Sequence, residues 1–344
     1  MRLVINLRRY AQTLWYLRPI QIFYRVLNLF PKKVNLILNK VPTSNTFSEV
    51  SWFSFNKTSS FDGNNFFFLN KKKQFNHNIW TEKHDYLWSY NLHYLDFLND
   101  LDLIDKKNYV SSWINNTNFA SGVAYEPYPT SLRIVNLIKW RITESANDLV
   151  INKSIFMQSR WLYKNIEWHL LANHLFANFK ALAFAGYYFN DKESHKWLKF
   201  AKKNIIKQIH QQILPDGGHC ELSPMYHNII LQDLIDLYLL NNRSLVNRDK
   251  NFENTLREAI EKMLFWSESI CHQDQDIPFF NDSCLGISPK ASELKKFIST
   301  IFKLKKFKNK DVNFFKHSGY ISVIKNSYKA LLDVGEVGFS HNPG

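Results

Sequence analysis

The densest group of side chains suited to chemistry lies in the stretch EWHLLANHLFAN, which begins at Glu167. It holds His169, Asn173, His174 and Asn178 among apolar residues. Asn178 follows His174 by four positions and shares its face of a helix, whereas Asn173 points roughly 100° away. These side chains could supply a base and amide donors to a substrate. They could equally be hydrogen-bonded core residues where two helices meet.

A second group occupies the stretch LPDGGHCELSPMYH, which begins at Leu214. Its first half has strong turn chemistry, and Ser223 followed by Pro224 predicts the start of a helix. Titratable side chains crowd the stretch more densely than a plain connector requires, so we favour a functional role for it. A zinc site is conceivable, but the ligand spacing matches no familiar pattern, and we expect no metal and no cofactor. The titratable side chains of this stretch are His219, Cys220, Glu221, Tyr226 and His227, and the zinc site would use His219, Cys220 and His227.

A third group combines the stretch WSYNLHY from Trp88 with the stretch YEPYPTSLRI from Tyr125. Aromatic and hydrogen-bonding side chains alternate in both, as expected of a groove that binds a saccharide. The candidate substrate contacts here are Tyr90, His93, Tyr128 and Arg133. Arg133 could hold an anionic group at the start of a helix, or it could be a buried structural arginine.

Helices must position these groups. From about Leu87 to Phe307, apolar residues recur at helical spacing between short polar breaks, with no strand between the helices. The chain is therefore predicted to be mainly α, a bundle, a solenoid or an α/α toroid of helical hairpins, and the lack of a fixed-period repeat weakens the solenoid. The clearest helical segments are 132–144, 154–170, 173–189, 194–213, 228–241 and 253–272.

The two ends of the sequence have a different character. Residues 40–80 are rich in Asn, Ser, Phe and Lys and predict irregular or short extended structure. Near the other end, Tyr320 to Ile324 and Ala330 to Val334 are β-prone runs separated by a turn around Asn326, as in a hairpin. A β-domain is expected to begin there and to be truncated, because an isolated hairpin is marginal in water.

The composition narrows the class of partner. The 344 residues include 44 basic and 30 acidic side chains, and the net charge of +14 favours a polyanion. The basic residues are scattered and no recognition module appears, so nucleic acid is not the expected partner. Three widely spaced cysteines predict no disulfide framework.

The N-terminal segment raises the question of location. Arg8 to Phe30 forms a basic amphipathic pattern, which we interpret as a helix packed on the flank of the domain rather than on an anionic membrane. No signal peptide and no stable membrane insertion are expected. The chain is thus cytoplasmic by sequence, or periplasmic if a leader is missing, and the oligomeric state stays open.

At these residues the sequence resembles the heparinase II/III family of polysaccharide lyases. The resemblance is carried, in order, by YNLHY from Tyr90, EPYPTSLRIVN from Glu126, NHLFANFKALAFAG from Asn173 and ILPDGGHCELSPMYH from Ile213. It implies an incomplete α/α toroid followed by an antiparallel β-sandwich. Residues 1–80 would be an amphipathic helix and irregular lead-in, residues 81–312 the substrate-binding toroid, and residues 313–344 the opening strands of the sandwich.

The resemblance also implies an activity, the β-elimination of a uronic-acid-containing polysaccharide. By resemblance Asn173 matches a residue that contacts the carboxylate, His174 a base or charge-stabilising histidine, and Tyr226 an acid or acid and base. A phenol has an ordinary pKa of about 10, so a base role for Tyr226 would need cationic neighbours, for which Arg133 and His227 are candidates. Further expected substrate contacts are Tyr90, His93, Tyr128, Arg133, His219, Glu221, His227 and Asp282.

Two departures from the family pattern matter. Some relatives carry a glutamate where this chain has Ala177, which bears on substrate handling. The family also supplies a further histidine from a segment that would follow Gly344, so the 344-residue chain is expected to be inactive or nearly so. The alternative function is a non-catalytic protein that binds acidic polysaccharide.

Overall fold

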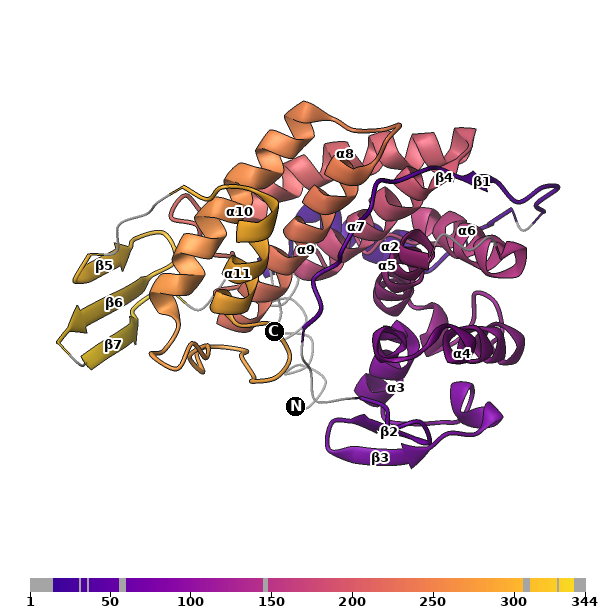
Figure 1. Cartoon of the computed structure of the whole chain (residues 1–344), viewed down its shortest axis with the longest axis horizontal. Coiled ribbons are helices and arrows are strands. Elements are labelled where there is room, and N and C mark those ends of the chain that lie inside the picture. Colours follow the sequence, from indigo (N-terminus) through magenta and orange to yellow (C-terminus); the bar gives the residue numbers. More distant parts are fainter. Residues whose placement is uncertain are drawn as a thin grey trace.

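The computed structural model describes residues 15–30, 32–35, 37–55, 60–144, 148–305, 310–326 and 328–336. Most of this chain is helical, as the sequence predicts (Figure 1). The helices are α2 (Pro19–Leu27), α3 (Tyr86–Tyr94), α4 (Leu103–Asn116), α5 (Pro127–Glu144), α6 (Leu149–Lys164), α7 (Ala172–Tyr188), α8 (Lys192–Gln212), α9 (Pro224–Arg243), α10 (Lys250–Ile270) and α11 (Ala291–Ile301). Short 3₁₀ turns are η1 (His77–Trp80), η2 (Asp96–Asp100) and η3 (Val123–Tyr125).

Side-chain caps fix where several helices begin. Asp148, Asp191 and Asp249 each accept hydrogen bonds from backbone N–H groups in the first turn of α6, α8 and α10. Ser223 caps α9 in the same way, with Pro224 at the first helical position, which confirms the predicted start of that helix. One predicted boundary is wrong: the segment 154–170 was expected to be continuous helix, but α6 ends at Lys164 and a turn follows.

In the described part of the chain, the strands are short and form three antiparallel sheets. The first joins β1 (Thr43–Ser44) to β4 (Phe189–Asn190), and the second joins β2 (Asn65–Phe68) to β3 (Lys71–Gln74). The third is a three-stranded sheet of β5 (Val312–Phe315), β6 (Tyr320–Lys325) and β7 (Tyr328–Asp333). The last two strands confirm the predicted hairpin, although Ser327 of its turn lies outside the described residues. The predicted domain boundaries stay a prediction.

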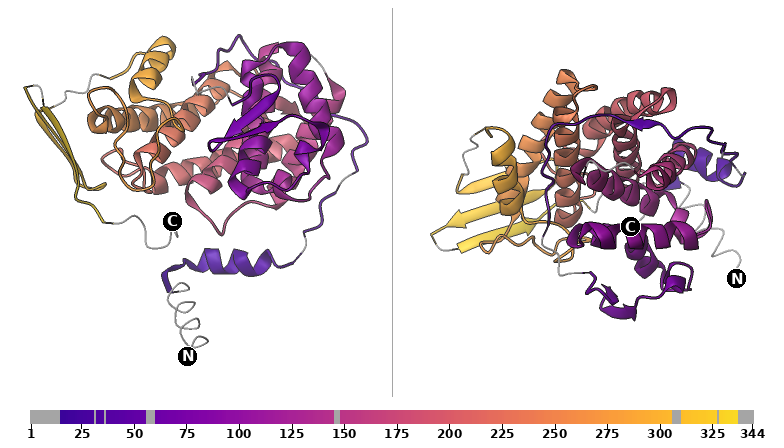
Figure 2. Two further views of the ribbon diagram at one scale, coloured as in Figure 1. Left: turned by 90° about the horizontal axis from the view of Figure 1, so that it is seen from below. Right: turned by 45° about the vertical axis from the view of Figure 1, so that its right-hand side comes forward.

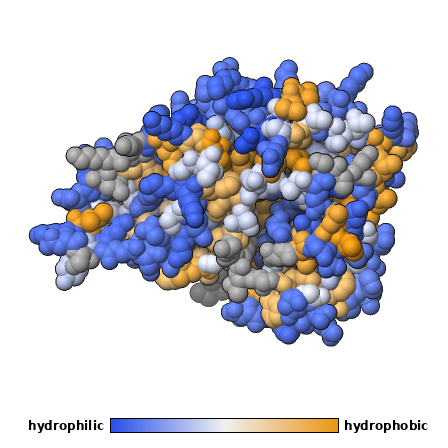
Figure 3. Space-filling model, viewed as in Figure 1, coloured by the Kyte–Doolittle hydropathy of each residue, from blue (hydrophilic) through white to orange (hydrophobic). Residues whose placement is uncertain are grey.

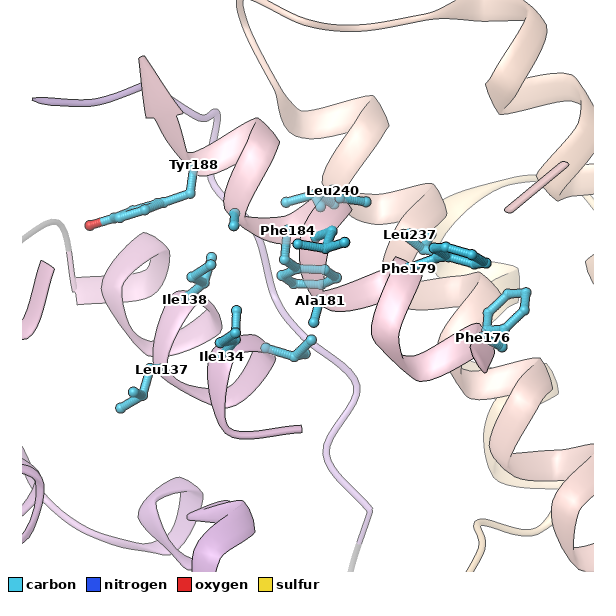
Figure 4. Packing of buried hydrophobic residues seen from close by; sticks show 14 of the residues in the cluster. Ile134, Leu137, Ile138, Phe176, Phe179, Ala181, Phe184, Tyr188, Leu237 and Leu240 are labelled. Carbon is cyan, nitrogen blue, oxygen red and sulfur yellow. The ribbon is translucent and has the colours of Figure 1, made fainter. Parts of the chain in front are cut away.

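The core is built around α7. Every residue from Leu175 to Tyr188 is buried, because α5, α8 and α9 surround this helix. Figure 4 shows apolar side chains of α5 and α9 beside those of α7. Gly186 lets α8 pack close to α7, because a Cβ at this position would lie 2.6 Å from the Cβ of Leu198 on α8. The apolar cluster also takes in Phe61, Phe66 and Phe68, so part of the predicted lead-in packs on the helical body.

A buried ionic cluster ties the inner helices together. Lys180 of α7 lies 2.6 Å from carboxylate oxygens of both Asp233 and Asp236 on α9. Lys139 of α5 reaches Asp236 at 2.7 Å. Burial alone would lower the pKa of Lys180, but the two aspartates raise it above its ordinary value. The cluster favours the charged forms of Lys180 and Asp236, whereas burial raises the pKa of Asp233 and lowers that of Lys139.

Helix α2 lies outside the helical body and docks on the turn after α6 (Figure 2). Its buried Gln21 donates a hydrogen bond to the carbonyl of His169, and Tyr24 stacks on Trp168 with ring centres 5.5 Å apart. This placement agrees with the predicted helix on the flank, although positions 8–14 of the predicted segment lie outside the described residues. No helix in the described ranges is long and apolar enough to span a membrane.

The three-stranded sheet packs by one face on α10 and by its first turn on the loop before α9. Polar groups cover most of the face seen in Figure 3, with hydrophobic side chains gathered in small areas, one of them over this sheet. Asp216 accepts hydrogen bonds from the backbone N–H groups of His317 and Ser318, both at 2.7 Å. Gly218 leaves room for the turn, because a Cβ there would lie 2.7 Å from the Cβ of Ser318.

Candidate active site

His174 stands in the first turn of α7 and is held on two sides. Its Nδ1 lies 3.3 Å from the carboxylate of Glu167, and Tyr128 stacks on its ring with centres 4.2 Å apart. Glu167 is buried and is itself fixed by the Asn178 amide at 3.0 Å. The His174 side chain remains 30% exposed, so the imidazole is oriented from within the protein and open to solvent.

The backbone just before His174 is strained. Leu171 and Ala172 both have positive φ angles, 67° and 45°, which cost ~1–3 kcal/mol each for residues other than glycine. These two residues reverse the chain between the turn after α6 and the start of α7. Strain of this kind gathers at functional sites, and here it sets the position of Asn173 and His174.

Asn173 and Glu221 connect the two polar stretches that begin at Glu167 and at Leu214. The backbone N–H of Asn173 donates to the Glu221 carboxylate at 3.0 Å. Burial raises the pKa of Glu221 to about 7, against the lowering effect of the Asn173 N–H and His174. Glu221 is therefore a carboxyl group that changes charge near neutral pH beside His174.

Tyr226 lies one turn into α9, after its Ser223 cap. Burial raises the pKa of this phenol to about 12, and the charges of Asp282 and Glu221 add to the increase. The expected cationic neighbours do not act on it: Arg133 and His227 are both fully buried and bonded elsewhere. Tyr226 is thus a protonated hydroxyl at neutral pH, suited to donating a proton.

Two more loops with positive φ angles meet beside Tyr226. Leu222 has a φ of 54° and Asn281 a φ of 51°, and the Asn281 amide donates to the Leu222 carbonyl at 2.8 Å. The Ser223 hydroxyl donates to the carbonyl of Asp282 at 2.7 Å. These bonds hold Asp282 near the start of α9, as its effect on the pKa of Tyr226 requires.

Aromatic side chains of α3 and α5 form a wall next to His174. Tyr90 stacks on Tyr128, and Tyr94 meets Tyr128 edge to face. The hydroxyls of Tyr86 and Tyr90 both donate to the carboxylate of Glu126. Of the residues expected to contact a saccharide, Tyr90 and Tyr128 therefore lie within one aromatic layer of His174.

Four other expected substrate contacts are enclosed in the protein. Arg133 has no exposed surface; it bonds to Gln158 and the carbonyl of His93, and its guanidinium lies 4.1 Å from the centre of the Trp113 ring. His93 accepts from the Trp113 indole at 3.1 Å. These placements favour the structural alternative for Arg133 and do not bring it or His93 to a substrate.

His219 and His227 are equally buried, at 1% and 0% exposure. His219 bonds to Gln212 at 3.0 Å, while His227 stacks on Trp266 and bonds to the carbonyl of Met263. The Cys220 sulfur lies 4.0 Å from His219 Nε2. Within the described ranges, no group of three or more histidine, cysteine or acidic side chains is arranged to hold a metal ion.

Glu167 and Glu126 were not among the residues predicted to act in the site. The signal for Glu167 was present, since an acidic residue in an otherwise apolar stretch must find a partner when it is buried. The partner could not be identified, because residues 168–170, just after Glu167, form a turn where the expected helix would continue. Glu126 stood inside a recognised motif, but its contact with two tyrosines of α3 depends on tertiary structure.

Comparison with known proteins finds similarity to one family. Residues 147–309, just under half of the chain, match the family model of the heparinase II/III N-terminus. The chain is similar to the heparinase II/III family. Two heparin-sulfate lyases are similar to it in sequence. The one from Pedobacter heparinus is 29% identical over 128 residues, 37% of this chain and 19% of that protein. The one from Bacteroides stercoris is 30% identical over 114 residues, 33% and 17% respectively.

Solved structures show the same fold for this heparinase II/III-like chain. The crystal structure of heparinase III has a TM-score of 0.58 at 18% identity, over 76% of this chain and 48% of that one. The heparan sulfate lyase HepC from Pedobacter heparinus has a TM-score of 0.51 at 22% identity, over 77% and 47%. The helical hairpins are therefore an incomplete α/α toroid, and the chain spans about half the length of these relatives.

Proposed function

We propose that the protein is a polysaccharide lyase that cleaves a uronic-acid-containing polysaccharide by β-elimination. The observation that carries the proposal is His174, exposed on one side and held by the buried Glu167 on the other. The similarity to heparin-sulfate lyases supports the same reaction class. The positive charge of the chain, +14, suits an acidic polymer.

The reaction needs a base for the proton at C5 of the uronate. With Nδ1–H of His174 donating to Glu167, Nε2 is left unprotonated and can accept the C5 proton. The electron pair of the C–H bond then forms the double bond between C4 and C5, and the bond from C4 to the glycosidic oxygen breaks. The Asn173 side chain, next to His174, is assigned to the substrate carboxylate, whose charge must be stabilised as the C5 proton leaves.

The leaving oxygen needs a proton, for which Tyr226 is the assigned acid. Its pKa of about 12 keeps the hydroxyl protonated at neutral pH, and the leaving alkoxide is a stronger base than the phenolate. After the step His174 carries the C5 proton and Tyr226 has lost its own. Transfer of a proton between the two groups through water restores the site.

The test is formation of an unsaturated uronate, which absorbs ultraviolet light. The protein expressed from its complete gene is incubated with heparan sulfate, hyaluronan, alginate and polygalacturonate in separate assays. We expect product from at least one polymer, with kcat reduced at least about a hundredfold in Tyr226→Phe. Salt-sensitive binding with no product from any polymer would contradict the lyase and support a non-catalytic binding protein.

A further inference from the structure

A cavity of about 350 Å³ lies between helix α2 and the helical body, apart from the residues assigned to catalysis. Its walls come from the end of α2, the loop before α5, the end of α6 and the turn that carries His169. The volume is at the lower end of the range for small-molecule sites, ~300–1,000 Å³, and suits one sugar unit rather than several.

The cavity borders the candidate active site through shared residues. Glu126 lines it and accepts hydrogen bonds from Tyr90, which stacks on Tyr128, the residue that stacks on His174. His169 also lines it, two positions after the Glu167 that orients His174. A ligand in the cavity is therefore separated from His174 by one layer of side chains.

Lys32 gives the cavity a positive charge that has no acidic partner within the described ranges. Its ammonium donates to the Asn28 side chain at 2.7 Å, and no carboxylate of that part of the chain lies within ion-pair distance. Burial lowers the pKa of Lys32, an effect that an incoming anion would oppose. Unlike Lys139 and Lys180 in the core, this lysine has no carboxylate partner among the described residues.

Apart from the Glu126 carboxylate, which accepts hydrogen bonds from Tyr86 and Tyr90, the remaining polar groups suit a sugar. The Asn28 amide donates to His169 Nδ1 at 3.1 Å, which places the proton of a neutral imidazole on Nε2 as a donor. Asn165 uses its amide N–H on the carbonyl of Trp161, so its oxygen can accept from a hydroxyl. Trp161 adds an aromatic surface of the kind that packs on a pyranose face.

We infer that this cavity is a saccharide subsite, in which Lys32 binds the acid group of a sugar unit of the substrate other than the one that reacts. The inference rests on the proposed function for its ligand class, an acidic polysaccharide. It assigns helix α2 and the residues after it to substrate binding, as one wall of the subsite.

The experiment compares Lys32→Gln with Lys33→Gln, a matched control on the exposed neighbouring lysine that does not line the cavity. Both changes are made in the His174→Ala background, so that no substrate is consumed. Affinity for hexasaccharides of heparan sulfate, hyaluronan and alginate is measured by calorimetry. We expect Lys32→Gln to weaken binding of at least one hexasaccharide about tenfold or more and to reduce its salt dependence, and Lys33→Gln to change affinity less than about twofold.

Equal effects of the two substitutions would overturn the subsite, because they would reflect diffuse charge attraction only. Failure of all three hexasaccharides to bind would also overturn it. The lyase proposal is judged separately by product formation with His174 present. A Lys32-specific loss of binding without any product would support the subsite and contradict the lyase. Product formation together with equal losses of affinity in Lys32→Gln and Lys33→Gln would support the lyase and contradict the subsite.

Discussion

Helices α7 and α9 each carry two sets of ionisable side chains, one inside the core and one at the surface. In the buried ionic cluster, Lys180 and the aspartates of α9 pair with each other at 2.6 Å. Toward the start of the same helices, His174 and Tyr226 are only partly covered. Glu167 holds His174 through Nδ1, and the Tyr226 hydroxyl hydrogen-bonds to Asp282. The same two helices thus carry one set of ionisable groups that is paired within the core and one set that is accessible to solvent.

The difference shows what each set is for. Charges that are fully paired within a core make removal of one member costly, because the other is left buried without compensation. Groups that remain open to solvent contribute less to folding and stay available to a substrate. Substitutions in the two sets should therefore separate stability from activity, and four of them test this separation.

The largest effect is expected from His174→Ala, because it removes the assigned base. We expect kcat to fall roughly a hundredfold to ten-thousandfold, with unfolding free energy changed by less than about 1 kcal/mol. Steady-state assays and chemical denaturation measure the two quantities. His195→Ala, an exposed histidine on α8, is the control and should leave both unchanged. A fully active His174→Ala would remove this residue from the mechanism.

Lys180→Met should lower stability and leave activity unchanged, because it leaves Asp233 and Asp236 buried with one cation fewer. The folded state should lose about 3–5 kcal/mol. Urea denaturation measures the loss, against Lys203→Met on the exposed face of α8 as the control. Where the variant remains folded, its activity should match that of the unaltered protein. A stability equal to that of the control would show that the buried pairs are dispensable.

Glu221 should make stability depend on pH. Its folded pKa is raised from 4.5 to about 7 by burial, so protonation favours the folded state. The corresponding stability is fully present below pH 4.5 and is lost as the pH rises through about 7. The free energy of unfolding should fall by up to about 3 kcal/mol over this range. Glu221→Gln mimics the protonated carboxyl and should abolish this fall.

Denaturation at several pH values checks this prediction, with the exposed Glu258→Gln on α10 as the control. The curves of Glu221→Gln and the unaltered protein should coincide below about pH 4.5, diverge as the pH rises to about 7, and stay apart above it. Parallel curves over the whole range would place Glu221 in a more solvated environment than the structure gives it.

The smallest effect is expected from Glu167→Gln, at the boundary between the two sets. The amide keeps the shape of the side chain and an acceptor for Asn178, but it removes the carboxylate that orients His174. We expect kcat to fall about tenfold, with KM unchanged, because Glu167 acts through His174 and does not contact substrate. A rise in KM alone would instead indicate a general disturbance of binding.

Much of the helical fold could be predicted from apolar spacing and caps. The Ser223 and Pro224 pair marked the start of α9 correctly, and the hairpin near the C-terminus was found from its β-prone runs. The end of α6 was missed because Ile166 and Leu170 continue the apolar spacing of Leu162 through a turn. In the structure, α2 docks on Trp168 in that turn, and such a tertiary contact cannot be read from the local sequence.

The orientation of polar residues was harder to predict than the helices themselves. Arg133 stands in α5 between two apolar residues, so the sequence alone does not say which way its side chain points, and the structure buries it on Trp113. Lys180 was a missed signal, because a single charge in the run LFANFKALAFAG must be buried with a partner. The partners come from α9, about 50 residues later, and no local pattern connects them.

The carbonyl of Leu222 joins the three-stranded sheet to the candidate active site. It accepts from the Tyr320 hydroxyl of β6 at 2.6 Å and from the Asn281 amide at 2.8 Å. Its residue stands directly between Glu221 and the cap of α9, which carries Tyr226. One carbonyl oxygen therefore holds three segments together: the sheet, the loop that positions Asp282, and the start of the helix that carries the assigned acid.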